Sequence, residues 1–309
     1  MKIAFVFPGQ GSQSVGMGKD LYDNFEEVRA IYKEASDALG YDVAELSFNG
    51  PKAELNKTFR TQPCLLTASM ASFKALELRG VKPSYVAGHS LGEYSALAAS
   101  GVISFKDAVR LTEKRGEFMQ EAVPEGRGLM AAILGLEREE IINICKSLES
   151  GYAAPANFNC PGQIVIAGEK EAVEEAMELA KEAGAKRSVA LAVSVPSHCN
   201  LMESASLKLA ELLKGIEFKA PGVPLVNNAD AAFLTDVDAI KESLIRQIKE
   251  PLLWEDSIRL MTDNGVDTFI EVGPGKILSG LIKRISEDAK LFNVGDKESL
   301  DSTINALGI

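Results

Sequence analysis

Short runs of apolar residues alternate along the chain with longer amphipathic stretches. Residues 3–7 (IAFVF), 84–88 (SYVAG) and 267–272 (DTFIEV) are rich in apolar and β-branched side chains, and glycine or proline ends each run. An alanine-rich stretch follows the second run and stops near Gly101, and a helix is expected after the third, from about Lys276. Buried strands that alternate with helices are typical of a parallel sheet with helices on both faces. We therefore predict a large α/β domain.

The middle of the chain has a different order of elements. Strand-like runs cover residues 128–135, 152–159, 163–168 and 187–195, and helix-like stretches cover 137–149 and 171–184. The order β-α-β-β-α-β is typical of a ferredoxin-like unit. We expect this unit to be a compact insertion. Residues 127–196 would then form a small subdomain, and residues 1–126 and 197–309 the large domain.

Composition narrows the class of protein. Of the 309 residues, 46% are hydrophobic and 25% are charged, as in ordinary soluble globular proteins. The formal net charge of −11 argues against a nucleic-acid partner, because phosphate binding needs a basic face. An acidic protein partner would need a local basic patch.

Cysteine usage and the N-terminus bear on the cell compartment. The four cysteines include no CxxC pair and the chain has two histidines, which argues against both a zinc site and a disulfide framework. Five apolar residues before Pro8 are too few for a signal peptide, and no run reaches membrane-spanning length. We expect a cytoplasmic protein with no metal, no cofactor and no membrane partner.

The stretch VAGHSLGEYSAL, residues 86–97, contains the pattern G-x-S-x-G around Ser90. A strand precedes this pattern and a small-residue helix follows it, which is the context of a nucleophile elbow. Gly88 and Gly92 would avoid collisions at the strained turn. Leu91 opens the helix, so its N–H would point toward the site. Five residues with two glycines also match by chance, but the context favours a nucleophile.

A serine nucleophile needs a base, and the candidates are His89 and His198. Adjacent side chains at such a turn point apart, so His89 is better interpreted as a structural support for the elbow. His198 follows a predicted strand and Pro196, at the sheet edge where ligands bind in open α/β sheets. Elimination leaves His198 as the base. No aspartate is identifiable as a third member, so a backbone carbonyl or an amide could orient the ring.

Two polar residues interrupt apolar helix faces. Arg115 lies on the inward stripe of a helix that should run from Ser104 to about Gln120. Burying an unpaired guanidinium is costly, so an internal salt bridge or a bound substrate carboxylate should neutralise it. Gln247 lies on the inner stripe of another helix, and a structural and a functional role are equally compatible with that position.

The loop FPGQGSQSVGMG after the first strand is rich in glycine. It lacks the lysine of a Walker A loop, and Ser14 stands where the dinucleotide fingerprint has its third glycine. The segment could be an ordinary loop between a strand and a helix. A tight loop of backbone N–H groups would also suit half of an oxyanion hole.

Six segments resemble one enzyme family along nearly the whole chain. They are FPGQGSQ (7–13), GHSLGEYSAL (88–97), KRGEFMQEAVPEG (114–126), NFNCPGQIVIAG (157–168), VSVPSHC (193–199) and EVGPGKIL (271–278). The chain resembles the malonyl-CoA:acyl-carrier-protein transacylases of bacterial fatty-acid synthesis and, more distantly, polyketide synthase acyltransferase domains. The resemblance implies a hydrolase-like α/β core with an inserted ferredoxin-like subdomain.

The resemblance also implies roles for individual residues. Ser90 would be acylated and His198 would be its base, while Arg115 would bind the malonyl carboxylate. The backbone N–H groups of Gln10 and Leu91 would form the oxyanion hole. The backbone carbonyl of Gln247 would orient the histidine, and malonyl-CoA and acyl carrier protein would be the partners.

Alternatives remain at this stage. A thioesterase or another serine hydrolase would use the same elbow with water as acceptor, and a trans-acting polyketide acyltransferase would use another carrier. Malonyl-selective polyketide enzymes commonly have phenylalanine where this chain has Ser197, so selectivity against methylmalonyl stays open. Lys186 and Arg187 are candidates for docking an acidic carrier, although two solvated surface charges would look the same in the sequence.

Overall fold

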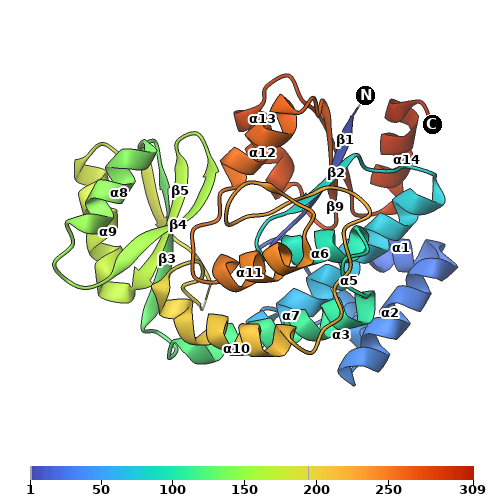
Figure 1. Cartoon of the computed structure of the whole chain (residues 1–309), viewed down its shortest axis with the longest axis horizontal. Coiled ribbons are helices and arrows are strands. Elements are labelled where there is room, and N and C mark those ends of the chain that lie inside the picture. Colours follow the sequence, from blue (N-terminus) through green and yellow to red (C-terminus); the bar gives the residue numbers. More distant parts are fainter. Residues whose placement is uncertain (1, 194) are drawn as a thin grey trace.

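A six-stranded sheet forms the centre of the large domain in the computed structural model, which describes residues 2–193 and 195–309 (Figure 1). Its strands are β1 (Ile3–Phe7), β2 (Tyr85–Gly88), β7 (Leu225–Val226), β8 (Phe233–Leu234), β9 (Thr268–Val272) and β10 (Lys290–Val294). The strand order is β10-β9-β1-β2-β7-β8. Every neighbouring pair is parallel except β7 and β8. The predicted parallel sheet is confirmed, with an antiparallel strand at one edge.

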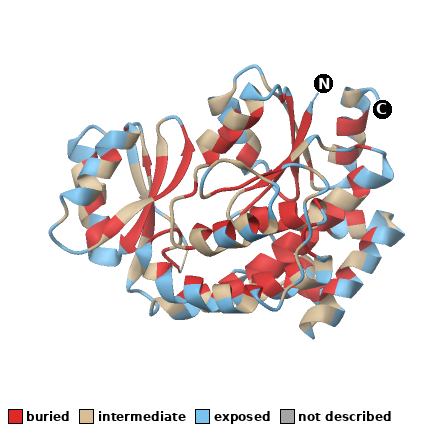
Figure 2. Ribbon diagram, viewed as in Figure 1, coloured by how far each residue is buried: buried red, intermediate tan, exposed pale blue. Residues whose placement is uncertain are grey.

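Burial explains why β1 is apolar at every position. Ile3, Phe5 and Phe7 belong to one apolar cluster, whereas Ala4 and Val6 belong to another on the opposite face of the sheet. Successive side chains of a strand point to opposite faces, so a strand covered on both sides has no polar position. The buried residues of Figure 2 accordingly concentrate on the central strands and on the helix faces against them.

Helices cover both faces of this sheet. One face carries α1 (Lys19–Asn24), α2 (Glu26–Leu39), α3 (Val43–Asn49), α4 (Lys52–Leu55), α5 (Thr58–Leu78), α6 (Leu91–Ala99), α7 (Phe105–Ala122), α10 (Glu203–Leu213), α11 (Val237–Gln247) and α14 (Lys297–Leu307). The other face carries α12 (Trp254–Asp263) and α13 (Ile277–Ile285). A short 3-10 turn, η1 (Asn200–Met202), precedes α10.

The second sheet is small and antiparallel. Its strands are β3 (Gly128–Leu134), β4 (Ala153–Cys160), β5 (Gln163–Glu169) and β6 (Arg187–Ala190), in the order β4-β5-β3-β6. Helices α8 (Arg138–Lys146) and α9 (Lys170–Glu182) pack on its outer face. This is the predicted ferredoxin-like topology.

The fourth strand of this sheet is shorter than the expected range of 187–195. It ends at Ala190, because only residues 187–190 pair with β3. Ser194, within that range, lies outside the described residues. The inner face of the sheet packs against the segment that follows, since Met130, Ala156 and Val165 cluster with Cys199.

Arginine side chains join the small sheet to the large domain. Arg138 at the start of α8 lies over the ring of Phe158 and forms a fork to the carboxylate of Asp256 on α12, with bonds of 2.8 and 3.2 Å. Arg284 on α13 donates to the carbonyl oxygen of Pro161, in the β4–β5 turn, at 2.7 Å. The two units therefore meet along α12 and α13.

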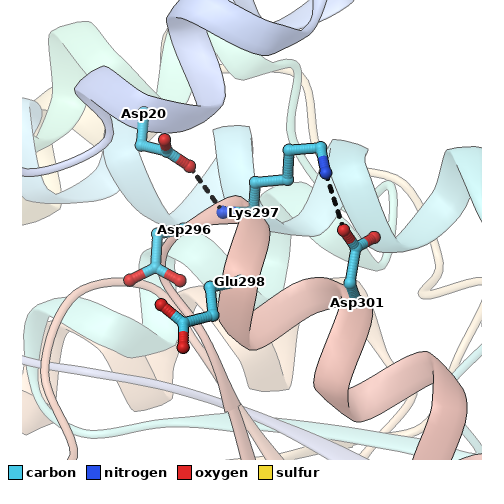
Figure 3. Close-up of a pocket in the computed structure, with 5 residues that line it drawn as sticks. All are labelled: Asp20, Asp296, Lys297, Glu298 and Asp301. Atoms are coloured by element: carbon cyan, nitrogen blue, oxygen red, sulfur yellow. Dashed lines mark hydrogen bonds and ion pairs between the residues drawn. The ribbon is translucent and has the colours of Figure 1, made fainter.

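Near the C-terminus, α14 packs beside α1. The carboxylate of Asp20 accepts a 2.7 Å hydrogen bond from the backbone N–H of Lys297, and the Lys297 ammonium pairs with Asp301 (Figure 3). Asp296 caps the same helix by accepting from the N–H of Ser299. Carboxylates thus satisfy the first turn of α14.

The described residues contain no helix long and apolar enough to span a membrane. All four cysteines are free thiols.

Candidate active site

Ser90 lies between β2 and α6 in a backbone conformation that non-glycine residues rarely adopt. Its φ and ψ are 53° and −108°. A side chain on Gly88 would collide with the carbonyl group of Gly92, and one on Gly92 would collide with the carbonyl of Phe7. The tight turn from strand to helix therefore requires both glycines and presents the Ser90 hydroxyl at the carboxyl end of the sheet.

The imidazole of His198 bridges Ser90 and the backbone of α11. Its Nε2 lies 2.8 Å from the Ser90 Oγ, and its Nδ1 lies 2.6 Å from the carbonyl oxygen of Gln247. Because a carbonyl only accepts, Nδ1 carries the proton and Nε2 is left to accept the proton of the serine. The residue itself has a φ of 63°, and its N–H donates to the Ile248 carbonyl at 2.9 Å.

The surroundings of His198 keep its ring neutral. Burial lowers the pKa of His198 to about 3, and the nearby positive charge of Arg115 adds to the effect. A neutral ring with a free Nε2 lone pair is the form of histidine that acts as a general base.

Arg115 projects from α7 into the same site and is fully buried. It donates to the Oε1 of Gln62 at 2.9 Å, to the Oε1 of Gln247 at 3.0 Å and to the Ser90 Oγ at 3.2 Å. Its Nε has no partner, and no ion pair of the described residues involves it. The internal salt bridge considered from the sequence is therefore not formed, and the guanidinium faces the serine with neutral partners.

Gln247 acts through both its backbone and its amide. The amide Nε2 donates to the Ser90 carbonyl at 3.0 Å and to the Oε2 of Glu93 at 2.9 Å. With its Oε1 on Arg115 and its backbone carbonyl on His198, this one residue contacts Ser90, Glu93, Arg115 and His198. This network explains why a polar residue lies on the buried face of α11.

Asn228, in the loop after β7, forms hydrogen bonds with the backbone of the turn that carries Ser90. Its Oδ1 accepts from the N–H of Ser90 at 2.8 Å, and its Nδ2 donates to the Gly88 carbonyl at 2.7 Å. Its own backbone N–H donates to Glu93 at 2.9 Å. Both residues are fully buried.

Burial raises the pKa of the Glu93 carboxyl to about 7, whereas its hydrogen bonds from Gln247 and Asn228 lower it. Its second oxygen, Oε1, has no partner among the described residues.

The glycine-rich loop after β1 lies directly against the elbow. A side chain on Gly9 would collide with the carbonyl oxygen of His89, and one on Gly92 would lie 3.0 Å from the carbonyl oxygen of Pro8. The side-chain amide of Gln10 donates to the Thr58 hydroxyl at 3.3 Å. Within the described chain, no side chain or backbone carbonyl accepts from the N–H of Gln10 or Leu91.

His89 takes no part in this network. Its Nε2 lies 2.9 Å from the Oδ1 of Asn159 on β4, and its ring packs edge-on against Trp254. The pKa of His89 is lowered by burial. It supports the turn and links it to the small sheet.

The structure brings together Ser90, His198, Arg115 and Gln247, with Gln10 and Leu91 beside them. Sequence reasoning missed Gln62, Glu93 and Asn228. The segment NNAD at 227–230 follows a strand, and asparagines at a strand's carboxyl end are a usable signal. Gln62 and Glu93 carry no comparable signal, because each is one polar residue within a helix.

The chain matches the family model described as acyl transferase domain over residues 4–295. It is 55% identical over 286 residues to the malonyl CoA-acyl carrier protein transacylase of Escherichia coli K12, which covers 92% of this chain and 93% of that protein. The protein of the same name from Bacillus subtilis is 47% identical over 99% of this chain and 97% of its own length. The chain belongs to the malonyl-CoA:acyl carrier protein transacylase family.

Solved structures of this transacylase family share the whole fold. An acyl carrier protein S-malonyltransferase from Vibrio cholerae superposes with a TM-score of 0.96 at 50% identity, covering 98% of this chain and 100% of that one. A malonyl-transacylase in complex with its type II polyketide synthase acyl-carrier protein gives 0.97, also at 50% identity, over 99% and 100%. The expected hydrolase-like core with a small second sheet is therefore confirmed.

Proposed function

We propose that this transacylase transfers the malonyl group of malonyl-CoA to the phosphopantetheine thiol of acyl carrier protein through a malonyl-Ser90 ester. Family membership supports the overall reaction, and the contacts among Ser90, His198 and Arg115 support these roles. The single observation with most weight is the buried guanidinium of Arg115, which lies beside the Ser90 hydroxyl and has no carboxylate partner among the described residues.

The first half-reaction acylates the enzyme. His198 Nε2 takes the proton of Ser90 while the Oγ attacks the thioester carbonyl carbon. The carbonyl oxygen gains the negative charge, and the N–H groups of Gln10 and Leu91 donate to it. Collapse of this intermediate breaks the C–S bond, and coenzyme A leaves as a thiol with the proton that His198 returns. The Gln247 carbonyl accepts from Nδ1 and stabilises the transient imidazolium.

The second half-reaction runs the same steps toward the carrier. His198 takes the proton of the phosphopantetheine thiol, whose sulfur attacks the malonyl-serine ester. The C–O bond breaks, and the proton passes to the Ser90 Oγ. Arg115 holds the distal carboxylate through both halves, which keeps the carbonyl carbon in place over the serine.

Intact-mass measurement tests this scheme. Incubation with malonyl-CoA should increase the mass of the enzyme by one malonyl group. After carrier protein is added, the enzyme should lose this group and the carrier protein should gain it. The Ser90→Ala variant should show no adduct. An undiminished adduct on that variant would place the nucleophile elsewhere.

Arg115 also weighs against a hydrolase that uses water as acceptor on neutral acyl groups. In the mass experiment, a hydrolase would lose the acyl adduct to water even when no carrier protein is present. Because one solved relative is complexed with a polyketide carrier, the same assay with fatty-acid and polyketide carriers would identify the pathway.

We also propose that residues 1–126 and 197–309 form one domain and residues 127–196 a subdomain, and that the enzyme acts in the cytoplasm. The small sheet lies wholly within residues 128–190, and the four free thiols suit a reducing compartment.

A further inference from the structure

A buried guanidinium and a buried carboxyl group face the same side-chain amide in the candidate site. The Oε1 of Gln247 accepts from Arg115 at 3.0 Å, and its Nε2 donates to the Oε2 of Glu93 at 2.9 Å. Arg115 and Glu93 are both fully buried. No carboxylate of the described residues pairs directly with Arg115, so Glu93, one amide group away, supplies the negative charge linked to it.

The charges of Glu93 and Arg115 act on each other through protein, because both side chains are shielded from solvent. Burial raises the pKa of Glu93 to about 7, and the positive charge of Arg115 acts against this rise. Burial likewise lowers the pKa of Arg115, and the negative charge of Glu93 acts against that fall. Water and salt screen buried charges much less than exposed ones. Each group therefore stabilises the charged form of the other.

The other titratable groups near Glu93 keep a constant charge around neutral pH. Asp230, in the loop after β7, pairs with Arg246 of α11 at 2.6 Å, and hydrogen bonding to that arginine lowers the pKa of Asp230. His198 stays neutral because burial lowers its pKa to about 3. Tyr94, the next residue of α6, stays neutral because burial raises its pKa to about 12. Between pH 6 and pH 8, Glu93 is thus the one of these groups that gains or loses a proton.

Protonation of Glu93 changes its charge and leaves its contacts in place. Its Oε2 accepts from Gln247 and from the backbone N–H of Asn228, both at 2.9 Å, whereas its Oε1 has no partner among the described residues. A proton on Oε1 would leave both of these hydrogen bonds intact. The carboxyl group can therefore change its charge without a rearrangement of the site.

We propose that Glu93 is the resting counter-charge of Arg115 and thereby determines how tightly the site holds the distal carboxylate of a malonyl group. This inference rests on the proposed function, in which Arg115 binds that carboxylate. Ionised Glu93 offsets part of the guanidinium charge and repels the substrate carboxylate, whereas protonated Glu93 does neither. Binding of a malonyl group thus favours the uptake of one proton from solvent by Glu93, and departure of the malonyl group to the carrier favours its release.

Such a counter-charge suits a transferase, because the malonyl-enzyme has to give up its acyl group. Binding energy that is equally large in the bound state and in the transition state does not raise turnover. With its charge partly offset, Arg115 keeps the planar fork that orients the malonyl group and does not over-stabilise the malonyl-enzyme.

Glu93→Gln isolates the effect of the charge. The amide oxygen can accept the same two hydrogen bonds, and the NH2 group takes the place of the unpartnered Oε1. At pH 8, above the pKa of about 7, protonating Glu93 costs the unaltered enzyme a factor of about ten. The variant avoids this cost, so its kcat/KM for malonyl-CoA should be roughly threefold to tenfold higher at pH 8 and nearly equal at pH 6. The kcat/KM for acetyl-CoA should be unchanged, because acetyl has no distal carboxylate.

The unaltered enzyme provides a second measurement that needs no variant. The ratio of kcat/KM for malonyl-CoA to kcat/KM for acetyl-CoA should fall roughly threefold to tenfold from pH 6 to pH 8. In Glu93→Gln this ratio should stay constant. Taking the ratio cancels the ionisation of the coenzyme A phosphates, which both thioesters share.

Glu182→Gln is the matched control, since it removes the same charge from an exposed position on α9. It should leave the kinetics of both thioesters and their pH dependence unchanged. A ratio that stays constant between pH 6 and pH 8 in the unaltered enzyme would overturn the counter-charge, and so would equal losses for both thioesters in Glu93→Gln. If the unaltered enzyme forms no malonyl adduct in the mass measurement, the proposed function itself fails.

Discussion

At the scale of single residues, the role proposed for Arg115 predicts which acyl groups the site should prefer. A charge-assisted bidentate pair with a carboxylate is worth about 2–3 kcal/mol in a partly dry site. Arg115→Ala should lower kcat/KM for malonyl-CoA by roughly two orders of magnitude, at about 1.4 kcal/mol for each factor of ten. Acetyl transfer should be spared or improved, because acetyl has no distal carboxylate. Parallel steady-state kinetics with both thioesters provide the measurement.

Lysine at the same position is the informative second variant. It keeps the charge but loses the planar fork, so Arg115→Lys should restore malonyl transfer only in part. Equal losses for malonyl and acetyl in Arg115→Ala would mean that the arginine is structural.

Glu93 should make the stability of the fold depend on pH. Burial raises its pKa from an ordinary 4.5 to about 7, so the folded protein holds this proton more tightly than the unfolded chain. The stabilisation is complete below pH 4.5 and is lost as the pH rises through about 7. The change amounts to roughly 3 kcal/mol at about 1.4 kcal/mol per pKa unit. His198, whose pKa is lowered, acts in the opposite direction below pH 6.5.

Glu93→Gln should remove the Glu93 contribution and leave that of His198. Relative to the unaltered protein, the variant should gain roughly 3 kcal/mol in free energy of unfolding between pH 5 and pH 8, and at pH 8 it should be the more stable protein. Denaturant unfolding at both pH values measures this. A variant with the same pH dependence of stability as the unaltered protein would show that Glu93 is ionised throughout.

At the scale of elements, the packing of α6 against β1 depends on a missing side chain. A methyl group on Gly92 would overlap the Phe7 carbonyl at the end of β1 and crowd the Pro8 carbonyl in the glycine-rich loop that follows. Gly92→Ala should therefore destabilise the fold by about 1–3 kcal/mol and reduce acylation. Thermal unfolding and adduct formation measure the two effects.

Gly280→Ala is the matched control, since it adds the same methyl group to a helix where nothing lies within 4 Å. It should stabilise the protein by about 0.5–1 kcal/mol. If the two alanine variants have the same thermal stability, the close approach of Gly92 to the backbone of β1 does not contribute to the stability of the fold.

The sequence predicted helices and strands well where the spacing of apolar residues along the chain matches the side chains that are buried. The apolar run of β1 and the cap of α7 at Ser104 are local features, and both elements form close to the expected ranges. The strand expected over 187–195 was too long, because its end depends on pairing with β3 and not on its own apolar residues. Similarly, Asn228 reaches Ser90 across 138 residues of sequence, and no local pattern encodes that contact.

At the scale of the whole molecule, the functional groups come from distant parts of the chain. Ser90 and Arg115 precede the small sheet, whereas His198, Asn228 and Gln247 follow it. The inner face of that sheet packs on Cys199, next to His198. The family resemblance predicted roles for residues that the fold brings together, but only the folded arrangement reveals that Gln62 and Glu93 contact them.

The position of β1 has a consequence for how the protein is made. This first strand pairs with β2 on one side and with β9, at residues 268–272, on the other. On the ribosome, the sheet centre stays incomplete until nearly the last strand has emerged, while the contiguous residues 128–190 can fold much earlier. One edge of β1 and the face that α12 and α13 later cover would remain exposed during most of synthesis, so chaperones should bind the nascent N-terminus.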